Sequence, residues 1–162
     1  MREGERMSET SMAPGHPTGL HHVRLTVTDI ARSKAFYTSL LGVEPAIDFS
    51  DQSDDPSARQ DPQRFFGGCT FALGDQLLGL RPTALPGDRF DPTRVGLDHV
   101  SLSVGSPAAL QQAADRLSAA GVEHGEVVEL RHLGIAIVSV QDPDDINLEL
   151  VAPLPRPTDS RA

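Results

Sequence analysis

The chain contains one strand-like segment twice, and this internal repeat restricts the possible folds more than any other feature. Residues Gly19–Val27 read GLHHVRLTV, and residues Gly96–Val104 read GLDHVSLSV. In each copy a histidine precedes residues that alternate between apolar and polar, as in a strand with one buried face. The repeat of such a segment predicts two similar modules in one chain.

The residues after each copy predict the same order of elements. In the first half, Asp29 can cap a helix that ends at Gly42, and three strand segments follow, up to Pro82. In the second half, Ser106 precedes a helix that ends at Gly121, and three more strands follow. The sequence therefore predicts an α+β fold of two tandem βαβββ modules, whose curved sheets enclose a pocket.

The module boundaries follow from composition. We expect the first module at residues 19–82 and the second at 97–153, joined by a linker rich in Pro, Gly and Asp at 83–96. Residues 1–18 and 154–162 have the composition of disordered tails. Two further pairs of segments support the repeat: LLGVEP (Leu40–Pro45) with AAGVEH (Ala119–His124), and LLGLRP (Leu77–Pro82) with LELVAP (Leu148–Pro153). The segment Ser50–Gln63 is predicted to be a polar loop.

Strand periodicity predicts that the sheet faces opposite the helices are polar. If Val23, Leu25 and Val27 pack on a helix, the alternate residues of that strand must point the other way. The same rule applies to the repeated strand and to the last strand. The predicted polar face carries His22, Arg24, Thr26, His99, Ser101, Ser103, Asn147 and Glu149.

Three residues of this polar face can bind a metal ion. Two imidazoles, His22 and His99, and the carboxylate of Glu149 are donors that a divalent transition metal accepts while keeping open positions. A single histidine at the start of a strand is more often a surface or core residue than a ligand. The repeat-equivalent pair and a glutamate in an apolar strand favour the metal, but the residues alone leave both interpretations open.

At these residues the sequence resembles the vicinal oxygen chelate superfamily, which includes glyoxalase I, bleomycin resistance proteins and extradiol dioxygenases. The segments that carry the resemblance are HHVRLTVTDIARSKAFYTSLLGVEP, LDHVSLSV and DPDDINLELV, within about Gly19–Pro153. The resemblance implies a divalent metal ion, with Fe(II) or Mn(II) favoured and Zn, Ni or Co possible. Its ligands would be His22, His99 and Glu149, and a substrate would chelate it through adjacent oxygens.

The family's fourth ligand position falls on Gly79, so the resemblance implies a three-ligand site here. This departure favours a dioxygenase slightly over a glyoxalase-like lyase, an isomerase or a transferase. The alternatives are a binder of the bleomycin-resistance kind, which sequesters a ligand without catalysis, and a fold whose site is empty. Two residues are catalytic candidates: Arg24 as an anchor for an anionic group and His132 as an acid or base at the cavity mouth. Each also has a simpler interpretation, as a structural ion pair and a surface histidine.

Composition excludes several classes of partner. The net charge of -9 gives no basic surface for nucleic acid or an anionic membrane. No apolar run reaches the roughly 18 residues of a membrane span, and no signal peptide is recognisable. Cys69 is the only cysteine, so we expect a reducing, cytoplasmic location and a buried, unreactive thiol. The expected partners are a small-molecule substrate and a second copy in a homodimer, with modules paired within or across chains.

Overall fold

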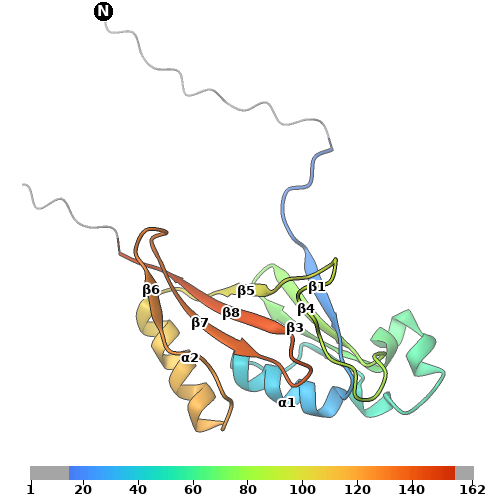
Figure 1. The fold of residues 1–162 in the computed structure, drawn as a ribbon. Coiled ribbons are helices and arrows are strands. Elements are labelled where there is room, and N and C mark those ends of the chain that lie inside the picture. The colour runs from blue at the N-terminus through green and yellow to red at the C-terminus, as the bar shows by residue number, and fades with distance from the viewer. Residues whose placement is uncertain (1–14, 156–162) are drawn as a thin grey trace, which may run out of the picture.

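The computed structural model describes residues 15–155, and its strands and α-helices form two βαβββ modules. The first module consists of β1 (His22–Thr26), α1 (Ile30–Leu41), β2 (Ile47–Asp48), β3 (Cys69–Leu73) and β4 (Gln76–Arg81). The second consists of β5 (Val100–Ser103), α2 (Pro107–Ala119), β6 (Val128–Leu130), β7 (Ile135–Gln141) and β8 (Asn147–Pro153). The predicted α+β class with two tandem βαβββ modules is confirmed (Figure 1). Residues 1–14 and 156–162 of the predicted tails lie outside the described residues.

Each module forms a four-stranded mixed sheet. The strand orders are β1-β4-β3-β2 and β5-β8-β7-β6, and the first strand of each module runs parallel to the last. Within residues 15–155, no helix is long and apolar enough to cross a membrane.

The helix ends lie where the sequence predicts them. The Asp29 side chain accepts a hydrogen bond from the backbone N–H of Arg32, and Gly42 ends α1 in the left-handed conformation with φ of 69°. Ser106 caps α2 in the same way as Asp29 caps α1. Arg116 of α2 donates hydrogen bonds to the last carbonyls of α1, so the two helices contact each other directly.

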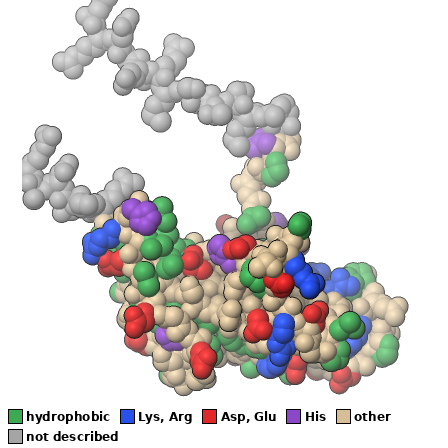
Figure 2. Space-filling view, in the orientation of Figure 1, with side chains coloured by type: hydrophobic (Ala, Val, Ile, Leu, Met, Phe, Trp, Pro, Cys, Tyr) green, Lys and Arg blue, Asp and Glu red, His purple; other side chains and the backbone are tan. Residues whose placement is uncertain are grey.

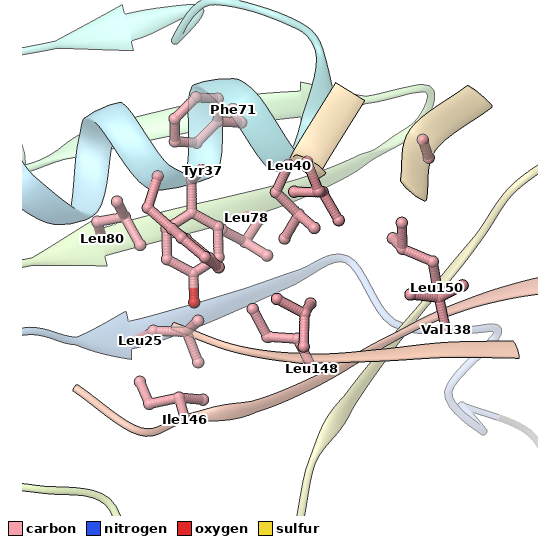
Figure 3. Packing of buried hydrophobic residues seen from close by; sticks show 14 of the residues in the cluster. Leu25, Tyr37, Leu40, Phe71, Leu78, Leu80, Val138, Ile146, Leu148 and Leu150 are labelled. Carbon is pink, nitrogen blue, oxygen red and sulfur yellow. The ribbon is translucent and has the colours of Figure 1, made fainter. Parts of the chain in front are cut away.

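The two modules share one apolar core. Figure 3 shows Tyr37 of α1 among Leu78 of β4, Leu25 of β1 and Leu148 of β8. All four side chains are buried, and the cluster continues along α2 and β7. Burial of Leu25 and Val27 confirms the predicted helix-side face of β1. The helical sides of both sheets therefore pack toward the common interior, which leaves the polar faces pointing outward.

Strand register corrects the repeat alignment by one residue. Arg24 of β1 pairs with Gly79 of β4, and Ser101 of β5 pairs with Glu149 of β8. Because His22 and His99 each stand two residues before Arg24 and Ser101, Gly79 is the counterpart of Glu149. A letter-by-letter match of the two closing segments would instead align Glu149 with a core residue on the opposite face. A shift of one residue reverses the face of every side chain in a strand.

The segment predicted as a polar loop, Ser50–Gln63, contains regular structure. Three short 3-10 helices lie at Ser50–Gln52, Ala58–Gln60 and Pro62–Gly67. Aspartates stabilise these turns: the carboxylate of Asp61, for example, accepts the backbone N–H of Gln63. The composition indicated turn residues correctly, but short side-chain caps of this kind have no periodic signal.

The acidic turn between β7 and β8 joins the modules. Asp142 and Asp144 are buried, at 3% and 4% exposure. Asp142 accepts hydrogen bonds from the Tyr37 hydroxyl at 3.1 Å and from two backbone N–H groups of its own turn. Asp144 accepts from the backbone and hydroxyl of Thr28 and from the Arg32 guanidinium at 2.6–2.7 Å. The turn was predicted, but its role in holding the first module was not.

We expect the substitution Asp142→Asn to gain stability relative to the native protein as the pH rises. Burial raises the pKa of Asp142, although the hydrogen bonds it accepts act in the opposite direction. The folded protein therefore keeps this proton at pH values where the unfolded chain has lost it, and native stability falls across that window. Asparagine has no proton to lose. Urea unfolding at several pH values from about 4 to 8 measures the difference; parallel pH profiles would contradict it.

Candidate functional site

His99 and Glu149, two of the three predicted metal ligands, share one cleft. His99 precedes β5, and Glu149 lies on β8, the parallel neighbour of β5. Both side chains line an open cleft of about 810 Å³ on the polar side of the second module. β8 holds Glu149, and His99 directly precedes β5, the strand that pairs with β8.

The carboxylate of Asp98 fixes the ring of His99. The distance from His99 Nδ1 to Asp98 Oδ1 is 2.5 Å. When Nδ1 carries the proton and donates it to this carboxylate, the lone pair of Nε2 remains available for a metal ion. Neighbouring residues of a regular strand would point to opposite faces, but β5 begins only at Val100. The chain before the strand is therefore free to bring the two side chains together.

Glu149 also has a neighbour that orients it. The hydroxyl of Ser101, the residue opposite in β5, donates a hydrogen bond of 2.9 Å to Glu149 Oε1. Glu149 is half-buried, and Oε2 has no hydrogen bond among the described residues. The side chain thus presents one carboxylate oxygen for a ligand.

His22, the third predicted ligand, lies elsewhere. It is exposed at the start of β1, with its Nδ1 atom 3.0 Å from that of His21. It lines a cavity of about 70 Å³ between the modules, which shares no residue with the cleft of His99. Among residues 15–155, no group of three or more His, Cys, Asp or Glu side chains is close enough together to hold a metal ion.

The donors nevertheless fit a divalent metal in their chemistry. An imidazole nitrogen and a carboxylate oxygen, each oriented by a second hydrogen bond, form part of a two-histidine, one-carboxylate set. In one copy of the chain this half-site comprises His99 and Glu149. The neighbouring His124 does not extend it, because its ring nitrogens contact Ser118 Oγ at 2.8 Å and the carbonyl of Gly125 at 2.7 Å.

The two catalytic candidates lie in different surroundings. His132 is exposed in the turn between β6 and β7, and it lines neither the cleft of His99 nor the cavity of His22. Arg24 lies on the polar face of the first module. Its guanidinium carbon is 5.8 Å from the ring centroids of both Phe65 and Phe66. The role of Arg24 as an anion anchor and that of His132 as an acid or base remain predictions.

Arg24 covers the place that corresponds to Glu149. A Cβ atom built at Gly79 would lie 3.3 Å from Arg24 Nε and 3.4 Å from Thr70 Oγ1. The sequence reasoning missed Arg81, whose guanidinium carbon lies 3.7 Å from the Phe66 centroid on the same side of the sheet. The alternation in LLGLRP would have placed Arg81 beside Gly79, because the two residues are two apart in one strand.

Cys69 behaves as predicted. The thiol is buried in β3, and burial raises the pKa of Cys69 to about 12. A thiol with so high a pKa holds its proton at neutral pH, so it is a poor nucleophile and a poor metal ligand.

Comparison with known proteins identifies the fold. A family model for the Glyoxalase/Bleomycin resistance protein/Dioxygenase superfamily matches residues 19–150. A glyoxylase/bleomycin resistance protein/dioxygenase domain from Frankia sp. EAN1pec is 29% identical, with a TM-score of 0.65, over 85% of this chain and 93% of that one.

Two more distant structures have the same fold. A lactoylglutathione lyase from Agrobacterium tumefaciens is 19% identical with a TM-score of 0.58, over 84% of this chain and 94% of that one. A genomically encoded fosfomycin resistance protein from Listeria monocytogenes is 18% identical with a TM-score of 0.59, over 85% and 94%. No curated protein matches the sequence significantly. From the family match and the paired βαβββ modules, the chain belongs to the Glyoxalase/Bleomycin resistance protein/Dioxygenase superfamily.

Proposed function

We propose that the protein is a divalent-metal-dependent enzyme whose small-molecule substrate chelates the metal through adjacent oxygens. The observation that carries this proposal is the pair of oriented donors, His99 and Glu149, in one open cleft. Membership of the superfamily supports it. A bound Fe(II) or Mn(II) ion would act as a Lewis acid or would activate oxygen.

The side chains of the second module have distinct tasks in this proposal. Asp98 holds the Nδ1 proton of His99, which keeps Nε2 unprotonated and directed for binding. The Ser101 hydroxyl donates a hydrogen bond to Oε1 of Glu149 and so limits the rotation of the carboxylate. Both contacts reduce the conformational freedom that binding would otherwise remove.

The third ligand, His22, would come from a second copy of the chain. His22 does not reach the cleft of His99 within one copy, and the polar faces of both modules point away from the shared core. In a symmetric dimer, the first module of each copy can face the second module of the other. Each dimer would then contain two sites, each with His22 from one copy and His99 and Glu149 from the other.

A mixing experiment tests this shared site. We expect His22→Ala and Glu149→Ala to lose the metal as separate proteins, but to regain about a quarter of the native metal content after unfolding and refolding together. Random pairing makes about half of the dimers mixed, and each mixed dimer has one intact site of two. Metal analysis of the purified mixture measures the recovery. No recovery, with native-like circular dichroism, would mean that one chain supplies all ligands or that the ligand set is wrong.

The reaction we favour is a dioxygenation, because Gly79 leaves the metal without a fourth protein ligand. Oxygen uptake with Fe(II) and a panel of catechols tests this preference, with the His99→Ala protein as the blank. Metal binding without oxygen uptake would support a lyase, an isomerase or a transferase instead. Saturable binding of a ligand by a protein that takes up no metal would favour a sequestering protein.

A further inference from the structure

Arg24 and Arg81 are the unpaired cations of the described structure. Among residues 15–155, every other Lys or Arg side chain has a carboxylate or carbonyl partner within the chain. Neither Arg24 nor Arg81 has a hydrogen bond or an ion pair from its side chain in this part of the chain. A chain with a net charge of -9 has many carboxylates to offer, so two neighbouring unpaired arginines are unusual.

The two guanidinium groups lie over the same aromatic ring. Arg81 stacks on Phe66 at 3.7 Å, and Arg24 lies 5.8 Å from the same centroid. Phe65 and Phe66 both have positive φ, 48° and 61°, which turns the chain sharply before β3. The aromatic faces hold both cations in place by cation–π contacts while leaving their N–H groups free to donate.

Two buried polar side-chain atoms at this place, one of them in Arg81 itself, also lack a hydrogen-bond partner. Only three such side-chain atoms occur among residues 15–155, and two of them are Thr70 Oγ1 and Arg81 Nε. Thr70 is 4% exposed and pairs with Gly79 across β3 and β4. Buried polar atoms nearly always have a hydrogen-bond partner, and a bound group is one reason for an exception.

These groups surround the one position of the sheet that has no side chain. The position of a Cβ at Gly79 is 3.3 Å from Arg24 Nε and 3.4 Å from Thr70 Oγ1, and Arg81 follows two residues later on the same face. We propose that these residues, which we call the Gly79 face, bind an oxyanion, a carboxylate or phosphate-type group. Guanidinium groups are opposite in charge to such anions, and their fork of N–H groups can donate two hydrogen bonds to one carboxylate or phosphate-type group, while the threonine hydroxyl is a further donor.

The Gly79 face is the charge-reversed counterpart of the metal half-site. At equivalent places of the repeat, the second module has Ser101 and Glu149 where the first has Arg24 and Gly79. The substrate would therefore carry an oxyanion in addition to the adjacent oxygens that chelate the metal. Assigning the oxyanion to the substrate rests on the proposed function, but binding of an anion at this face does not.

Binding of simple anions by the metal-free protein tests the Gly79 face. Titration with benzoate and phenylphosphonate at low ionic strength, followed by calorimetry or ligand-observed NMR, gives the affinities. We expect at least one of the two anions to bind at least about tenfold more tightly than benzamide, the uncharged analogue of benzoate. Which anion binds better distinguishes a carboxylate site from a phosphate-type site. Equal binding of benzamide, or no binding of either anion, would overturn the proposal.

Matched variants locate the binding. Arg24→Met and Arg81→Met should each weaken the anion by about tenfold or more, whereas Arg94→Met, which removes the same charge from an exposed side chain, should not change it. Gly79→Glu keeps both arginines but supplies an internal carboxylate, so it should abolish anion binding. Equal losses in the Arg94 variant would show a general charge effect and refute the site. Because Arg81→Met can disturb folding, Arg81→Lys, which keeps the charge but lacks the planar fork, serves as a second variant and should bind more weakly than native protein.

Metal content separates this inference from the proposed function. Arg81→Met should keep the native metal content, because Arg81 is not one of the proposed ligands His22, His99 and Glu149 and a guanidinium does not bind a metal cation. Anion binding in a protein that takes up no metal would sustain the Gly79 face and refute the metalloenzyme. Metal uptake without anion binding would sustain the metalloenzyme and refute the Gly79 face.

Discussion

Replacing His99 by alanine is expected to lower the affinity for Fe(II) or Mn(II) at least about a hundredfold. The variant removes one of the two nitrogen ligands, and even the loss of a residue that only orients a ligand typically costs about 10–100-fold. Asp98→Asn should therefore give a smaller loss, of about tenfold or more, because a neutral amide holds the His99 ring less firmly than a carboxylate does. Competition with a coloured chelator at neutral pH measures the affinities of both variants and of the native protein.

His124→Ala is the matched control for this experiment. His124 lines the same cleft as His99, but its ring nitrogens already contact Ser118 and Gly125. We expect its removal to leave the metal affinity unchanged. If the His124 variant lost as much affinity as the His99 variant, the ligand assignment would be wrong. If neither lost any, the cleft would not be the metal site.

Replacing Asp144 by alanine is expected to lower the free energy of unfolding by about 3 kcal/mol. The substitution removes the partner of Arg32 and leaves the backbone N–H of Thr28 without an acceptor. Breaking a buried pair costs about 3–5 kcal/mol, and an unsatisfied buried donor about 1–3. The low end applies because the Arg32 side chain is 44% exposed and can be hydrated instead. The melting temperature should fall by about 6–12 °C.

Asp145→Asn provides the comparison for Asp144→Ala. Asp145 belongs to the same turn but is exposed, and its φ of 68° is one that asparagine tolerates. Its free energy of unfolding should stay within about 0.5 kcal/mol of the native value, as is usual for surface positions. Urea unfolding of the native protein and of the two variants measures these free energies of unfolding. A loss below about 1 kcal/mol for Asp144→Ala would mean that the turn does not hold the modules together.

The sequence predicted the fold because its signals are local and occur twice. The alternation around His22 and His99 indicated strands with one polar face, and Asp29 and Gly42 marked the ends of a helix. These features depend on neighbours within a few residues. The same reasoning identified Glu149 as the acidic member of an otherwise apolar last strand.

Contacts between distant segments could not be predicted in this way. The ring of Phe66 beneath Arg81 depends on a left-handed turn of two bulky residues, which no propensity favours. The segments LLGLRP and LELVAP look alike, but aligning them letter by letter places Gly79 one residue away from Glu149, its true counterpart. The hydrogen-bonded register of the strands, and not the similarity of the letters, decides to which face of the sheet a side chain points. The burial of Asp144 depends on Arg32 and Thr28, which belong to the other module.

The space-filling view shows charged side chains of both signs spread over the visible face (Figure 2). Because positive and negative side chains are mixed on this face, a group of like charges indicates a binding site only where no opposite charge lies close to it. Lys34 and Asp48, for example, form an ordinary exposed pair at 2.9 Å, which contributes little to stability.

The bonds between Thr28 and Asp144 also bear on how the chain folds as it is made. They join residues 116 positions apart, so a long loop must close before they form, and contacts of such separation slow folding. The first module leaves the ribosome well before the turn that completes its interior. Until then, the apolar side of α1 around Tyr37 lacks its neighbour Leu148 of β8 and the hydrogen bond to Asp142. A chaperone that shields this surface during synthesis would protect the nascent chain from aggregation at its most vulnerable stage.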